Sequence, residues 1–172
     1  MRRKVIVSII IIICYLLQTT LFSALSFASI SPNLLIVVVS SFGFMRGKKE
    51  GLFIGFFCGL ILDIFCGSSI GFYALLYMYI GYVNGYFRKV FYPEDIKLPM
   101  LLIACSDVGC NLLIYFFLFL FRNRYDFQYY LFHIIAPELV YTMVMTILIY
   151  VVVLKVNQHL EAIEKRSASK FV

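Results

Sequence analysis

The sequence has few charged residues: Asp, Glu, Lys and Arg make up 14% of its 172 residues, whereas 63% are hydrophobic. Soluble domains carry roughly a quarter charged residues and about half apolar ones, so this composition excludes an ordinary soluble domain. Tryptophan is absent and prolines number four, and uncharged runs therefore continue with little interruption. Such runs, repeated along the whole length, are typical of a multi-pass helical membrane protein.

Sequence motifs for metal, nucleotide or hydrolytic chemistry are also lacking. The five cysteines are an odd number without a CxxC pair, so we expect neither a disulfide framework nor a metal site. No HExxH pair and no phosphate-binding glycine loop is present. The pattern GSSIG offers Ser69 as a nucleophile beside Asp63 and His133, but a nucleophile elbow requires a strand–turn–helix context. We therefore expect no enzyme, no catalytic residue and no cofactor.

Six apolar segments predict an all-α integral membrane protein with six transmembrane helices. We expect a single transmembrane domain over residues 1–154 and a short basic cytoplasmic tail over residues 155–172. At about 1.5 Å per residue, the segments approach the length that crosses roughly 30 Å of hydrocarbon. Pro32 interrupts the second segment, so that helix is expected to tilt, kink or begin irregularly. The expected spans are Val5–Leu25, Phe27–Met45, Gly51–Cys66, Ile70–Phe87, Pro99–Phe121 and Leu131–Leu154.

The positions of the basic residues predict the orientation. Of the 15 Lys and Arg residues, all except Arg122 and Arg124 fall on the side that holds both termini. Cytoplasmic loops carry the excess of basic residues, so both termini are expected in the cytoplasm. The net charge of +6 gathers at the ends of apolar runs, which favours contact with membrane lipid headgroups over a nucleic-acid partner.

The first segment also resembles a secretory signal peptide, because MRRK precedes an apolar run and then the small residues SALSFAS. Cleavage there would leave five spans. The apolar run continues through Leu21 and Phe22, beyond the usual length of such a region. We therefore interpret it as an uncleaved anchor.

Glycines recur at four-residue intervals along the third segment and the turn that follows. Small residues four apart allow a neighbouring helix to approach closely. The next segment repeats the spacing with Tyr73, Tyr77, Gly81 and Gly85, so the two helices are expected to pack together, large residues beside small ones. The alternative is that this surface binds a helix of another protein. The series on the first of the two segments is Gly47, Gly51, Gly55 and Gly59, then Asp63, then Gly67 and Gly71.

Asp63 is unusual because a carboxylate within a membrane costs roughly 2.5 to 3.5 kcal/mol on insertion scales. Such a group normally faces the bundle interior and finds a hydrogen-bond donor. The candidate donors are the hydroxyls of Ser68 and Ser69 and the backbone N–H groups that begin the next helix. A turn-shaping role, a partner contact and a ligand contact remain as alternatives.

Three further polar residues fall within apolar segments. Asp107 and Asn111 are four residues apart and hence lie on one helix face, and Glu138 follows Pro137. Polar groups of this kind can mark a transport path. They can also join helices by hydrogen bonds, usually worth under ~2 kcal/mol each.

The segment Arg46–Tyr82 carries a family resemblance. It reads RGKKEGLFIGFFCGLILDIFCGSSIGFYALLYMYIGY, and PNL (Pro32–Leu34) opens the span before it. The order RG, EG, GFFxGLxxDxxxGxxxG and YxxxGY, within a chain of six expected spans, resembles the MreD family. Those proteins determine rod shape in bacterial cell elongation.

The resemblance implies a non-enzymatic, multi-pass protein of the bacterial plasma (inner) membrane. It implies direct binding to the bitopic protein MreC and association with MreB, RodA and a class B penicillin-binding protein. The function would be to help regulate peptidoglycan synthesis and cell shape. The MreD fold is similar to the six-helix substrate-binding (S) subunits of energy-coupling-factor transporters. The alternative function is therefore a small-molecule-binding subunit of a membrane transporter.

Overall fold

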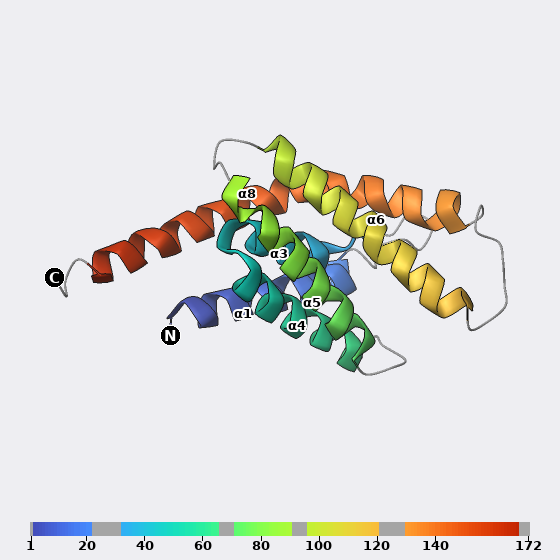
Figure 1. Cartoon of the computed structure of the whole chain (residues 1–172), viewed down its shortest axis with the longest axis horizontal. Coiled ribbons are helices and arrows are strands. Elements are labelled where there is room, and N and C mark those ends of the chain that lie inside the picture. Colours follow the sequence, from blue (N-terminus) through green and yellow to red (C-terminus); the bar gives the residue numbers. More distant parts are fainter. Residues whose placement is uncertain (1, 22–31, 66–70, 91–95, 121–129, 169–172) are drawn as a thin grey trace.

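All elements in the described part of the chain are helical, as predicted. The computed structural model describes residues 2–21, 32–65, 71–90, 96–120 and 130–168. It contains six α-helices, one 3-10 helix and two π-helical turns within those ranges (Figure 1). In chain order these are α1 (Arg2–Leu16), η1 (Leu17–Leu21), α3 (Leu34–Arg46), α4 (Lys48–Phe65), α5 (Phe72–Asn84), η3 (Gly85–Val90), α6 (Lys97–Leu120), η4 (Leu131–Ile135) and α8 (Ala136–Ala168).

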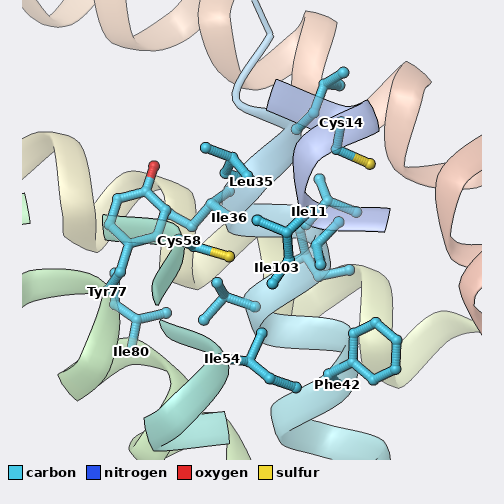
Figure 2. Packing of buried hydrophobic residues seen from close by; sticks show 14 of the residues in the cluster. Ile11, Cys14, Leu35, Ile36, Phe42, Ile54, Cys58, Tyr77, Ile80 and Ile103 are labelled. Atoms are coloured by element: carbon cyan, nitrogen blue, oxygen red, sulfur yellow. The ribbon is translucent and has the colours of Figure 1, made fainter. Parts of the chain in front are cut away.

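Helix α3 is the centre of the core. Its sequence is apolar on every side, and all its residues from Leu34 to Met45 are buried. A helix that is hydrophobic all round requires neighbours on all sides. It contacts α1, α4, α5, α6 and α8. Figure 2 shows side chains of these neighbours converging on it, including Ile11 of α1, Cys58 of α4 and Ile103 of α6.

The start of α3 follows from the sequence PNL. Pro32 cannot continue a helical hydrogen-bond pattern, and Asn33 acts as the N-cap because its side-chain oxygen accepts a hydrogen bond from the Ile36 N–H at 3.3 Å. With 13 residues, α3 is about 20 Å long. The predicted irregular start is therefore present at Pro32, while the predicted beginning of this span at Phe27 lies outside the described residues.

Two of the described helical segments are long and apolar enough to cross a membrane, Lys97–Phe117 and Leu131–Ala162. Val5–Thr20 and Leu34–Arg46 are shorter apolar helices. Segment Leu131–Ala162 exposes large apolar side chains at four-residue intervals, including Val140, Val144 and Leu148. An apolar face of that extent suits a lipid or protein environment and not water.

Several helix ends differ from the predicted spans. The first helix changes to a π-helical turn at Leu17, and α5 ends at Asn84 and continues as the 3-10 helix η3. The last helix continues beyond the predicted end of the span at Leu154 and runs to Ala168, since no Pro or Gly interrupts it. Asn157 and Leu160 in this extension are buried. The predicted boundary between a transmembrane domain and a tail is thus not a break in helical structure.

Candidate functional site

Helices α4 and α5 meet backbone to backbone, and glycine makes this possible. Gly51, Gly55 and Gly59 lie on the contacting face of α4 and are buried. A Cβ atom added at any of them would collide with a carbonyl oxygen of α5. The contact is antiparallel and keeps the four-residue spacing on both helices. The oxygens opposite these three glycines belong to Gly81, Tyr77 and Tyr73, respectively.

Other glycines of the same series have different roles. Gly47 has a φ of +99° and is the single residue that connects α3 to α4, so it is a turn residue and not part of the α4 face. Gly71 has a φ of +104° and precedes α5, and a Cβ there would meet nothing within 4 Å. Positive φ favours glycine at these two positions for backbone reasons, and a packing role for them stays a prediction. Gly85 packs against the backbone of Lys48, and Gly67 lies outside the described residues.

Asp63 hydrogen-bonds the N-terminus of α5. Its Oδ2 accepts from the backbone N–H groups of Gly71 at 3.0 Å and Ala74 at 2.9 Å, and its Oδ1 accepts from that of Tyr73 at 3.0 Å. The side chain is 1% exposed. The first N–H groups of a helix have no partner within the helix, and the helix dipole favours a negative charge there. The predicted donors were the hydroxyls of Ser68 and Ser69 and the backbone N–H groups of the next helix. The backbone N–H groups are observed as donors, and the two serines lie outside the described residues.

A second set of polar contacts joins α3, α5 and α8. The Tyr77 hydroxyl donates to Asn33 Oδ1 at 2.8 Å, and the Asn33 N–H donates to Thr142 Oγ1 at 3.2 Å. The N-cap of the central helix is thereby tied to two of its neighbours. Asn33 and Tyr77 are both part of the motifs that resemble the MreD family. Nothing in the sequence indicated Thr142, because 109 residues separate it from Asn33.

Asn84 is a polar residue that the sequence analysis missed. Its side-chain amide is 2% exposed and donates toward Ser40 Oγ of α3 at 3.3 Å and Ser106 Oγ of α6 at 2.7 Å. The same amide reaches the Ile80 carbonyl at 3.0 Å. A single amide thus connects three helices. The signal that could have found it is an asparagine three residues after Gly81, in an otherwise apolar run.

The predicted polar residues of the later helices lie near one another. Asp107 and Asn111 are buried in α6, at 1% and 6% exposure, while Glu138 at the start of α8 is half-buried. The Asn111 amide interacts with Glu138, and the Thr142 hydroxyl interacts with Asp107. That second contact falls short of hydrogen-bond geometry: neither Asp107 oxygen has a hydrogen-bond partner among the described residues. These groups therefore lie where α6 meets α8.

Of the hydrolytic triad that can be drawn from the sequence, the described residues include Asp63 and His133. Both Asp63 oxygens accept hydrogen bonds from the α5 backbone, and His133 is exposed in η4. Ser69 lies outside the described residues. Within the described ranges, no three His, Cys, Asp or Glu residues group so that they could hold a metal ion.

In the described ranges, the architecture is all-helical and two helices are long and apolar enough to cross a membrane, as is typical of a helical membrane protein. The family model described as rod shape-determining protein MreD matches residues 1–160 of this chain. The chain therefore belongs to the MreD family, whose members are membrane proteins with a role in rod shape determination. No curated protein and no solved structure matches the chain.

Proposed function

We propose that this protein is a non-enzymatic membrane scaffold of the bacterial cell-elongation complex, and that it binds MreC directly. Through this complex, with MreB, RodA and a class B penicillin-binding protein, it helps regulate peptidoglycan synthesis. The observation that carries the proposal is the match of the MreD family over residues 1–160. The proposal includes six membrane spans with both termini in the cytoplasm. It also includes a fold similar to the S subunits of energy-coupling-factor transporters.

The geometry supports a scaffold because two buried polar groups, Asp63 and Asn84, are used inside the chain. Asp63 caps α5, and Asn84 joins three helices. The glycine face of α4 is covered by α5 of the same chain. The exposed apolar faces of the outer helices are the surfaces that we assign to a partner helix. These features support a role in holding other proteins.

Photo-crosslinking tests the contact with MreC. A photo-reactive phenylalanine analogue would replace Phe53 on α4, Leu101 on α6 or Val144 on α8, all more than half exposed. We expect at least one exposed position to crosslink to MreC, and no crosslink from the buried control Phe42 on α3. Cells depleted of the protein should become round, and the wild-type gene should restore rods. Absence of every crosslink together with rod-shaped depleted cells would contradict the proposal.

A small-molecule-binding subunit of a transporter is the second candidate function. Asp107 favours it, because its carboxyl group is buried without a hydrogen-bond partner among the described residues and lies near Glu138. Buried ionisable groups inside a membrane often mark a binding site. Mass spectrometry of the purified protein under native conditions is the test. A stoichiometric small molecule that is lost in Asp107→Asn would favour this function over the scaffold.

A further inference from the structure

A strongly basic pocket of about 680 Å³ lies where the α3–α4 turn meets η3. Five of its side chains are cationic and one, that of Glu50, is acidic. The first turn of α4 forms part of the wall, and the N-terminus of a helix favours a negatively charged group. The residues that line the pocket are Arg46, Gly47, Lys48, Lys49, Glu50, Gly85, Tyr86, Arg88 and Lys89.

Aromatic contacts hold one cation of this pocket in place. The Lys48 Nζ lies 3.4 Å from the centroid of the Tyr86 ring and 5.7 Å from that of Tyr82. A cation over an aromatic face is attracted to the ring and loses freedom of movement. Gly85 brings η3 against the backbone of Lys48, so the two walls of the pocket are packed together.

An apolar groove of about 500 Å³ between α1 and α4 adjoins this pocket. Lys49 and Glu50 line both spaces. The rest of the groove is lined by Val7, Ser8, Ile11, Phe53, Ile54 and Phe57. A free phosphate would use the pocket alone, and an apolar helix would use the groove alone. A molecule with a phosphate group and a long hydrocarbon chain would use both.

We propose that the chain binds an anionic glycerophospholipid of the membrane at this place, with the phosphate in the basic pocket and an acyl chain in the groove. Basic pockets between transmembrane helices on the cytoplasmic side are suited to anionic headgroups. In the orientation with 13 of the 15 Lys and Arg residues inside, the pocket lies at the cytoplasmic leaflet. The site thereby makes the scaffold sensitive to the phospholipid composition of that leaflet.

The charge requirement is tested by titrating the purified full-length protein with phosphatidylglycerol or phosphatidylcholine and counting bound lipids by native mass spectrometry. We expect selective binding of phosphatidylglycerol. The double variant Lys49→Ala/Lys89→Ala should weaken it about 25-fold, since a basic residue contributes about fivefold to anionic lipid binding. The matched control Lys97→Ala/Lys155→Ala removes two exposed cations outside the pocket and should bind like the wild type. Equal weakening in both double variants would overturn the proposal.

The groove requirement is tested with Ser8→Trp, which fills the apolar space without changing charge. The control Ile9→Trp adds the same ring to an exposed α1 residue outside the groove. We expect only Ser8→Trp to weaken binding of phosphatidylglycerol. Tighter binding of a polyprenyl phosphate than of phosphatidylglycerol would overturn the phospholipid assignment. So would unchanged lipid binding in Ser8→Trp with loss of MreC crosslinking, because the groove would then hold a protein helix. A normal circular dichroism spectrum establishes that each variant is folded.

Discussion

At the scale of single residues, Asp63 shows how an acidic group is accommodated in an apolar helix. Its carboxylate has three backbone N–H donors from one helix N-terminus, so its interactions with water are replaced by charge-assisted hydrogen bonds. The same contact satisfies donors of α5 that would otherwise be buried without partners. The residue therefore stabilises the α4–α5 hairpin from its closed end.

This role predicts that removing the carboxylate destabilises the protein. In Asp63→Ala three N–H groups lose their acceptor, and an unsatisfied buried donor costs about 1–3 kcal/mol. We expect a loss of at least about 2 kcal/mol in Asp63→Ala and a smaller loss in Asp63→Asn, whose side-chain oxygen still accepts. Thermal unfolding of the two variants in detergent measures the difference. Two variants that both unfold at the wild-type temperature would contradict the capping role.

At the scale of elements, the α4–α5 hairpin is built by matching repeats. Gly51, Gly55 and Gly59 on one helix meet a four-residue series on the other, in antiparallel register. Membrane helices gain little hydrophobic energy from one another, because lipid is equally apolar. Close backbone approach, with its van der Waals contacts, is the physical source of this pairing.

A matched pair of glycine substitutions tests the close approach. Gly55→Ala would place a methyl group against the Tyr77 carbonyl, whereas Gly109→Ala on α6 would meet nothing within 4 Å. Overpacking costs typically 1–3 kcal/mol, so we expect Gly55→Ala to destabilise by about that amount. Gly109→Ala should be neutral or stabilise by up to about 1 kcal/mol through helix propensity. Equal unfolding temperatures for the two variants would show that α4 and α5 are not packed backbone to backbone.

The hairpin also shows how much a sequence can reveal. The four-residue repeats predicted that these helices pack together, and hydropathy predicted the helical class. Hydropathy could not predict which face of α3 packs against which neighbouring helix, because α3 is apolar on nearly every side. The partners of Asn84 were not predictable either, because Ser106 lies 22 residues away on another helix. Helix ends such as Leu16 depend on local hydrogen bonding that composition does not determine.

At the scale of the whole molecule, one buried helix organises the rest. Because α3 is surrounded by five helices, its neighbours present their remaining faces outward, and these faces are apolar. Figure 1 shows the start of α1 and the end of α8 at the same end of the molecule. The basic pocket formed by the α3–α4 turn and η3 agrees with placing this end in the cytoplasm, as the positive-inside rule requires.

The proposed orientation predicts the behaviour of topology reporters. A fluorescent protein that matures only in the cytoplasm, fused after Ala168, should fluoresce. Alkaline phosphatase, which is active only outside, should be inactive when fused after Lys89 and active when fused after Phe65. The physical reason is that Lys and Arg residues prefer the cytoplasmic side of the membrane. The cations around Lys48 and Arg88 therefore oppose the opposite orientation. Phosphatase activity after Lys89 would reverse the orientation, and with it the placement of the basic pocket at the cytoplasmic leaflet.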